Sequence, residues 1–161
     1  MDDKHKLLRN YTQNIDMLEI AAGVPDERLV FAHGTTRTGS CISCDTKYLH
    51  KDIMPFIRKG EVFSCIKCDE PVKPDVVFFG ERLPDRYRKL IDSDLNQCDL
   101  LIVLGTSLRV YPIASIIEHI KSSIPVIIMN FHLPSGINLA NPHVFLSGDI
   151  QETSHILKKM I

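Results

Sequence analysis

The sequence predicts an α/β fold in which a parallel sheet carries a small inserted module. Three apolar runs support the sheet, namely "DLLIVLG" (99–105), "IPVIIMN" (124–130) and "HVFLSG" (143–148). Continuous runs of this kind are typical of strands that are buried on both faces of a sheet. Between the first two runs, "PIASIIEHIKSS" places isoleucines on one helical face, at Ile113, Ile116, Ile117 and Ile120. Strands that alternate with helices predict a parallel arrangement.

The segments on either side of these runs are predicted in the same way. Residues 9–23 start polar and become apolar at helical spacing, and Gly23 is a typical helix stop. "RLVFAHG" (28–34) is a short β-like run. Residues 35–75 are polar and loop-rich and hold two cysteine pairs, which indicates a small inserted module. A terminal amphipathic stretch carries Ile156, Leu157 and Met160.

Length and composition exclude several classes of function. The chain has 161 residues, a formal net charge of −1, and 44% hydrophobic against 24% charged residues, which suits one soluble domain with an insert. Without a basic excess we expect no direct nucleic-acid partner and no membrane partner. No apolar run approaches the roughly 20 residues of a membrane span. The opening "MDDKHKLLRNYTQ" has no hydrophobic signal region, so we expect an intracellular protein.

Four of the five cysteines form two C-x2-C pairs separated by 20 residues, at Cys41, Cys44, Cys65 and Cys68. This spacing is typical of a zinc ribbon, in which four thiolates complete a tetrahedron. A closed shell of four cysteines leaves no position for water, so we expect a structural zinc ion. A redox pair fits less well, because a thioredoxin-like site needs one CxxC in a βαβ setting. Cys98 is interpreted as a small buried hydrophobe at a strand start.

Polar residues follow the predicted strands where a cofactor would bind. "GTSLRV" and "NFH" lie at the carboxyl ends of two strands, and ligands of parallel sheets bind beyond those ends. His33, in "FAHGTT", is not needed as a zinc ligand once four cysteines fill the shell. It is then either a core histidine or a catalytic base.

The ordered set of motifs resembles the sirtuin family, the NAD-dependent protein lysine deacylases. The motifs are "TQNID", "AHGT", the two CxxC pairs, "VKPDVVFFGERLP", "GTSLRV" and "MN", and they extend over nearly the whole chain from Tyr11. The resemblance implies a partial Rossmann-like parallel sheet with a small inserted zinc-ribbon module. The NAD-binding domain would comprise residues 1–34 and 76–161, with the zinc module at 35–75.

The resemblance also implies roles for individual residues. His33 would be the general base that takes a proton from a ribose hydroxyl, with Asn14 as a second catalytic residue. The expected NAD contacts are Gln13, Asn14, Ile15 and Asp16 around nicotinamide and its ribose, and Gly105, Thr106, Ser107, Val110, Asn130 and Ile150 on the other side of the cofactor. Nicotinamide and O-acetyl-ADP-ribose would be the products.

The segment "VVFFGE" would bind the substrate, an acyl-lysine peptide or protein, with histones among the candidates. It would form an edge strand to which an extended peptide adds, with Val76 and Phe79 lining an apolar tunnel. The full segment consists of Val76, Val77, Phe78, Phe79, Gly80 and Glu81. From the pattern alone, a simple core role for "VVFF" is equally compatible.

The sequence departs from the family pattern at two places. His132 stands where the family usually carries a glutamate, and the chain opens just before "TQNID", without the family's glycine-rich turn. The favoured reading is a fragment of an active deacylase in the nucleus or cytoplasm. The alternative is a truncated, catalytically incompetent form that acts as a zinc-containing scaffold. In either case an exposed sheet edge would allow oligomerisation. A zinc-ribbon nucleic-acid binder fits the near-zero charge less well.

Overall fold

The computed structural model describes residues 6–134 and 140–160, which form two compact units. The N-terminal unit consists of residues 9–89, and the C-terminal unit consists of residues 90–160 together with 6–8. The predicted domain boundaries at 34/35 and 75/76 both lie inside the N-terminal unit and stay a prediction. The first five residues of the predicted polar opening, and the side chain of Met160, lie outside the described part of the chain.

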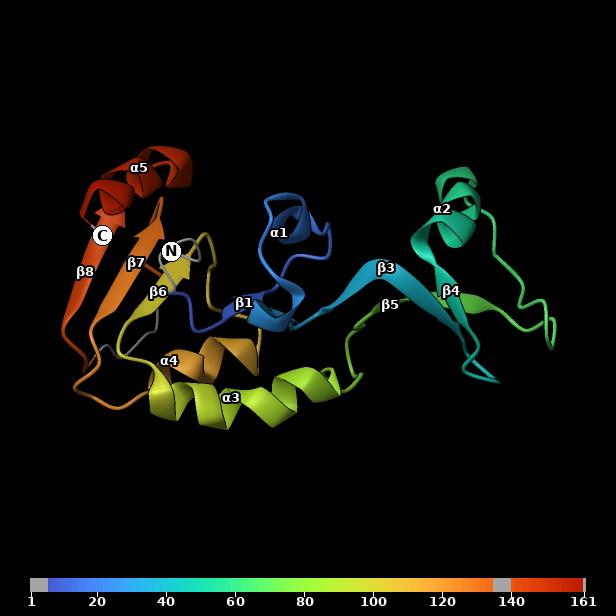
Figure 1. Ribbon diagram of the computed structural model, residues 1–161, viewed down its shortest axis with the longest axis horizontal. Coiled ribbons are helices and arrows are strands. Elements are labelled where there is room, and N and C mark those ends of the chain that lie inside the picture. Colours follow the sequence, from blue (N-terminus) through green and yellow to red (C-terminus); the bar gives the residue numbers. More distant parts are fainter. Residues whose placement is uncertain (1–5, 135–139, 161) are drawn as a thin grey trace. The chain divides into compact units, whose positions relative to one another are not determined.

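The C-terminal unit contains the predicted parallel sheet. Its strands β6 (Leu101–Leu104), β7 (Val126–Asn130) and β8 (His143–Ser147) pair in that order, all parallel. Figure 1 shows the three strands side by side, with α5 (Ile150–Met160) beyond their carboxyl ends. The three apolar runs are therefore confirmed as strands, each slightly shorter than its run.

Buried aliphatic side chains between the sheet and its crossover form the core of this unit. The cluster consists of Val103, Ile117, Ile120, Val126 and Ile128. The predicted helix after β6 is a 3₁₀ turn, η3 (Ile113–Ser115), followed by the single turn α4 (Ile116–His119). Of the four isoleucines predicted to share one helical face, Ile113, Ile117 and Ile120 are buried, whereas Ile116 is only half-buried.

The N-terminal unit begins with a short parallel strand pair. The strand β1 (Asn10–Thr12) pairs with β2 (Leu29–Phe31), and between them lie α1 (Leu18–Ala21) and the 3₁₀ turn η2 (Asp26–Arg28). The predicted helix over 9–23 is therefore wrong except for one turn. Residues 10–12 are extended because their backbone pairs with β2, and Thr12 is buried there.

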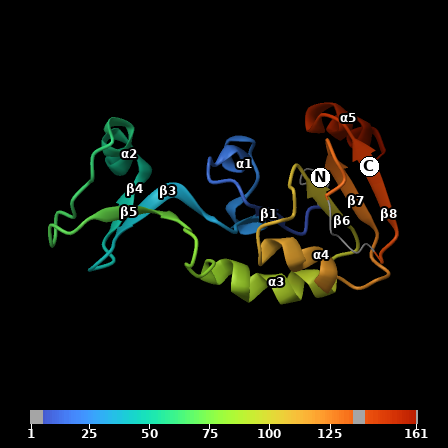
Figure 2. The same ribbon diagram turned by 180° about the vertical axis from the view of Figure 1, so that it is seen from behind.

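The rest of this unit is a three-stranded antiparallel sheet with one helix. The sheet order is β4 (Lys47–Leu49), β3 (Gly34–Cys41) and β5 (Val72–Val76), and Figure 2 shows α2 (His50–Lys59) beside β4. The Asp52 carboxylate accepts the N–H of Leu49 at the start of α2, and Gly60 ends the helix with φ +71°. The predicted loop-rich module thus contains more regular structure than expected.

The helix α3 (Asp85–Gln97) starts in the N-terminal unit and ends in the C-terminal one. Arg86 fixes its first turn, since its guanidinium donates to the carbonyl oxygens of Leu29 (2.8 Å) and Glu27 (2.9 Å). The Tyr87 ring packs edge-to-face on Tyr11, with 5.9 Å between the centroids. Within the described ranges, no helix has the length and apolar character needed to cross a bilayer.

Candidate functional site

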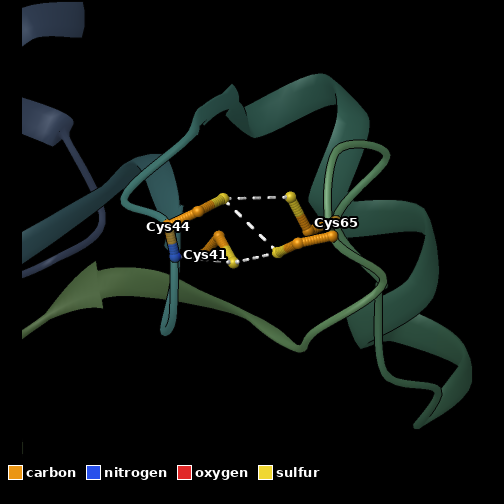
Figure 3. Close-up of side chains that lie close together, drawn as sticks. Cys41, Cys44 and Cys65 are labelled. Atoms are coloured by element: carbon orange, nitrogen blue, oxygen red, sulfur yellow. Dashed lines mark hydrogen bonds between the residues drawn. The ribbon is translucent and has the colours of Figure 1, made fainter.

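The four predicted zinc ligands come together in the N-terminal unit. Their Sγ atoms all lie within 4.8 Å of one another, with 3.4 Å from Cys41 to Cys68 and 3.6 Å from Cys44 to Cys65. Figure 3 shows the sulfur atoms converging from two separate turns. A tetrahedron with zinc–sulfur bonds of about 2.3 Å has edges of about 3.8 Å. The sulfur positions therefore fit one zinc ion bound by four thiolates.

The two cysteine pairs lie in two turns of the same construction. In the first, the N–H of Asp45 donates to the carbonyl of Cys41 (3.2 Å); in the second, the N–H of Asp69 donates to that of Cys65 (2.8 Å). Both aspartates have a left-handed backbone, with φ +56° and +61°. The N–H groups of Ser43 and Cys44 point to the Cys41 sulfur, at 3.4 and 3.5 Å. Such donors stabilise the negative charge of a thiolate.

The surroundings of the sulfurs prepare them unequally for metal binding. The Tyr48 hydroxyl donates to Cys65 Sγ (3.1 Å) and is the main cause that lowers the pKa of that thiol to about 6. Thr46 lowers the pKa of Cys44 in the same way. A backbone bond from Glu70 lowers the pKa of Cys68, but the nearby sulfurs of Cys41 and Cys44 raise it more, to about 12. Four thiolates at this spacing therefore need a cation to coexist.

His33 lies just beyond the carboxyl end of β2, next to the loop that follows β1. Its Nδ1 is 3.3 Å from the carbonyl oxygen of Gln13, and its own carbonyl accepts the N–H of Val77 (2.9 Å). A carbonyl can only accept, so the neutral ring carries its proton on Nδ1 and leaves the Nε2 lone pair available. This is the tautomer that a general base needs.

The loop after β1 contains the residues that are predicted to contact nicotinamide and its ribose. Asn14 is exposed, and its backbone N–H donates to the Thr12 hydroxyl (3.1 Å). The carbonyl of Ile15 accepts the hydroxyl of Thr36 (3.1 Å), and Asp16 accepts the N–H of Leu18 at the start of α1 (3.1 Å). The loop thus contacts His33 through the carbonyl of Gln13, and its backbone is joined to β3 through Thr36.

The predicted contacts in the C-terminal unit gather at the carboxyl ends of β6, β7 and β8. Asn130 donates from Nδ2 to the carbonyl of Thr106 (2.8 Å). Gly105 has φ +57°, and a Cβ there would lie 2.6 Å from Ile150 Cδ1. Ser107 and Val110 are exposed on the loop after Gly105. The structure therefore brings Gly105 close to Ile150 and Thr106 close to Asn130 at this end of the sheet, and among the described residues it shows no such contact for Ser107 and Val110.

The segment 76–81 differs from its prediction. Only Val76 belongs to β5, opposite Gly34, and residues 77–81 leave the sheet in a turn that the N–H of Glu81 closes on the carbonyl of Phe78 (3.0 Å). The prediction of an edge strand over 76–81 is wrong beyond Val76, because Gly80 adopts φ +86° and the Glu81 carboxylate takes the N–H of Phe78 (2.8 Å).

The exposure of these side chains also decides against a simple core role. Phe78 is 54% exposed and Phe79 is 100% exposed. In the N-terminal unit a shallow cavity of about 410 Å³ is lined by Val76 and Val77 among others, but not by Phe79. Phe79 therefore does not line this cavity, in contrast to its predicted place in an apolar tunnel.

Two residues of this unit, Tyr48 and Asp75, carry no local signal in the sequence. Tyr48 binds a zinc-ligand sulfur and also accepts the N–H of Ile66 (2.9 Å). Asp75 accepts hydroxyl hydrogen bonds from Thr38 (2.5 Å) and Ser40 and pairs with Lys47 (3.2 Å). Both depend on partners far away in the sequence, so no local spacing marks them.

The N-terminal unit has four cysteines placed to bind one metal ion and a histidine beyond a strand end, and the C-terminal unit has a parallel sheet. A family model described as "Sir2 family" matches residues 1–112. The chain is 46% identical over 152 residues to the NAD-dependent protein deacetylase sirtuin-3 of Mus musculus, covering 93% of this chain and 45% of that protein. It is 45% identical over 140 residues to the NAD-dependent histone deacetylase SIR2 of Candida albicans, covering 81% of this chain and 27% of that protein.

A solved structure, that of Sir2Tm bound to a propionylated peptide, matches the fold with a TM-score of 0.87 at 27% identity. The match covers 99% of this chain and 66% of that one. The chain belongs to the Sir2 family. The expected sirtuin resemblance and α/β fold class are confirmed, and the chain spans less than half of the length of the two curated relatives named above.

Proposed function

We propose that the protein containing this chain is an NAD-dependent protein lysine deacylase. It removes an acetyl or related acyl group from a lysine side chain and releases nicotinamide and O-acetyl-ADP-ribose. The observation that carries the proposal is the hydrogen bond between His33 Nδ1 and the carbonyl of Gln13, which leaves Nε2 free to accept a proton. The names of the relatives, NAD-dependent deacetylases, support the same chemistry.

Each half of the predicted cofactor site has its own task in this proposal. NAD, when bound, supplies the ribose carbon that is attacked and the nicotinamide that leaves. His33 accepts the proton of a ribose hydroxyl, and Asn14 acts with it. Gln13, Ile15 and Asp16 contact the nicotinamide side. The strand-end group binds the remainder of the cofactor: Gly105, Thr106, Ser107, Val110, Asn130 and Ile150.

The substrate is an acyl-lysine peptide or protein that binds along residues 76–81. The Candida relative is named a histone deacetylase and the Sir2Tm structure holds a propionylated peptide, which supports histone tails as candidates. A nuclear or cytoplasmic location follows from this substrate class. The zinc ion holds the module of residues 35–75 together and takes no part in the chemistry, because four cysteines fill its shell.

Association through the sheet edge is a further proposal. Among the described strands β6 pairs only with β7, so no described strand pairs with its other edge. Such an edge can pair with another strand. Light scattering on the full-length protein checks this: a dimer that dissociates when proline replaces Ile102 supports edge pairing, and a concentration-independent monomer contradicts it.

The test of the function measures nicotinamide released by the full-length protein from NAD and an acetyl-lysine peptide. His33→Ala is expected to lower the rate by about 10²–10⁴-fold, the usual contribution of a general base. His155→Ala, an exposed histidine on α5, is the matched control and keeps the wild-type rate. Full activity of the His33→Ala variant would show that His33 is not the general base. A wild-type protein that binds the peptide without releasing nicotinamide would favour the scaffold alternative.

A further inference from the structure

Lys73 makes three contacts with the turn that follows β5. Its Nζ donates to the carbonyl of Val76 (2.8 Å) and to Glu81 Oε2 (2.9 Å), and it lies 4.2 Å from the centroid of the Phe78 ring. The side chains of Lys73 and Glu81 are 31% and 42% exposed. One ammonium group therefore contacts the last residue of β5, Val76, and two residues of the turn, Phe78 and Glu81.

Glu81 closes the same turn from its other end. The oxygen that meets Lys73 also accepts the N–H of Phe78 (2.8 Å), and the Glu81 N–H donates to the Phe78 carbonyl (3.0 Å). The bond from Phe78 and then the one from Lys73 hold the pKa of Glu81 below its usual value. Charge-assisted bonds of this kind are stronger and more directional than neutral ones.

The tip of the turn has no comparable support. Phe79 is 100% exposed, and Gly80 has no atom within 4 Å of the place where a Cβ would stand. The start of the turn, in contrast, is joined directly to the base, since the N–H of Val77 donates to the carbonyl of His33 (2.9 Å). The position of Phe79 relative to His33 thus depends on the two charged side chains that shape the turn.

We propose that Lys73 and Glu81 are positioning residues that clamp the turn 77–81 in the shape that receives the acyl-lysine peptide. The proposal rests on the deacylase function and deepens it. Neither side chain acts on the reacting atoms; together they hold the backbone of Phe78, Phe79 and Gly80 ready before the peptide arrives. Preorganisation of this kind strengthens binding because less ordering remains for the binding step.

The test separates peptide binding from catalysis in the full-length protein. Lys73→Met keeps the aliphatic stem and removes the charge, and Glu81→Gln keeps the size of the side chain. Each is expected to raise KM for an acetyl-lysine peptide about tenfold, with KM for NAD, kcat and zinc content within about twofold of wild type. Lys73→Arg restores most of the peptide affinity, because it can still donate to Glu81. Lys51→Met, an exposed lysine of α2, is the control and leaves KM unchanged.

Three results would overturn the clamp. They are an unchanged peptide KM in both variants, a fall in kcat alone, and a loss of zinc that accompanies the change in KM. If the wild-type protein releases no nicotinamide, the deacylase function fails, and fluorescence anisotropy with a labelled acetyl-lysine peptide tests the clamp separately. Binding about tenfold weaker in Lys73→Met then supports it, and equal binding overturns it.

Discussion

Asp75 is the charged residue on which the antiparallel sheet of the N-terminal unit depends most. Its side chain is 26% exposed and receives hydrogen bonds from Thr38 and Ser40 on β3 and from Lys47 on β4. Burial alone would raise the pKa of this carboxyl, but the bonds from Ser40, Thr38 and Lys47 outweigh it and lower the pKa. One carboxylate therefore holds three strands together.

The depressed pKa of Asp75 predicts a pH-dependent stability. A carboxyl with a lowered folded-state pKa contributes its stability above the unfolded pKa of about 3.9 and loses it as the pH falls through the folded value. Asp75→Asn is expected to lower the unfolding free energy by about 1–3 kcal/mol at pH 7. The difference from wild type should shrink below about pH 4, as measured by urea denaturation at several pH values.

Asp92→Asn is the control for this experiment, because Asp92 is an exposed residue on α3. Its unfolding free energy should stay within about 0.5 kcal/mol of wild type. If Asp75→Asn shows a deficit that does not change between pH 7 and pH 3, the carboxylate charge is not the source of the stability.

Gly34 is the residue whose replacement would disturb His33 most directly. It has φ +73°, and a Cβ there would lie 2.0 Å from the carbonyl oxygen of Asp75, a backbone atom that cannot move aside easily. Gly34→Ala is expected to lower the unfolding free energy by more than about 3 kcal/mol, from left-handed strain and overpacking together. Thermal denaturation followed by circular dichroism measures it.

Gly23 offers a matched control for that substitution. Its φ is +85°, also left-handed, but no atom lies within 4 Å of its Cβ position. Gly23→Ala should therefore cost only the strain of about 1–2 kcal/mol. Equal losses at the two glycines would show that the close approach of Asp75 is not what requires Gly34.

The two cysteine turns come from separate elements, and we expect a bound metal ion to hold them together as one module. One turn ends β3 and the other lies between α2 and β5, so a bound metal would connect segments that are separated by β4 and α2. The core around them is small and consists of Cys41, Tyr48, Ile53, Cys65 and Val72. Two of the five buried residues are themselves ligands, so little apolar packing remains without the metal.

Removal of zinc is therefore expected to unfold this module. Elemental analysis should find one zinc per chain, and Cys41→Ser or a strong chelator should remove it and lower the melting temperature by about 10 °C or more. Cys98→Ser is the control for metal content, because Cys98 lies outside the cluster and this variant should keep its zinc. Much less than one zinc per chain in the wild type, or a Cys41→Ser protein as stable as wild type, would contradict the structural role.

At the scale of the whole molecule, the parts that the sequence predicts are those with a local signal. The strands β6, β7 and β8 follow from unbroken apolar runs, and the zinc site follows from cysteine spacing. The order of "TQNID", "AHGT" and "GTSLRV" leads to the family. Each apolar run and each cysteine pair is a signal of a few residues, and the zinc site and the family follow from the order and spacing of several such signals.

The remainder depends on partners that are distant in the sequence. β1 has only three residues and is extended because it pairs with β2, whereas the helix prediction for residues 9–23 comes from the apolar spacing of the residues after it. α3 buries Tyr87 and the carboxylate residue Asp94, which weakens its apolar periodicity. The turn after Val76 is held by the hydrogen bonds of Lys73 and Glu81, which the apolar pattern of "VVFF" does not indicate.

The proposed deacylase function requires that removal of an acyl group from lysine consumes NAD. The most direct measurement incubates the full-length protein with an acetyl-lysine peptide and NAD, and quantifies nicotinamide and deacetylated peptide in the same sample. We expect one nicotinamide for each acetyl group removed. Neither product should form when NAD or the acetyl group is left out. Deacetylation that proceeds without NAD would contradict it, as would nicotinamide release from NAD at an equal rate with an unmodified peptide.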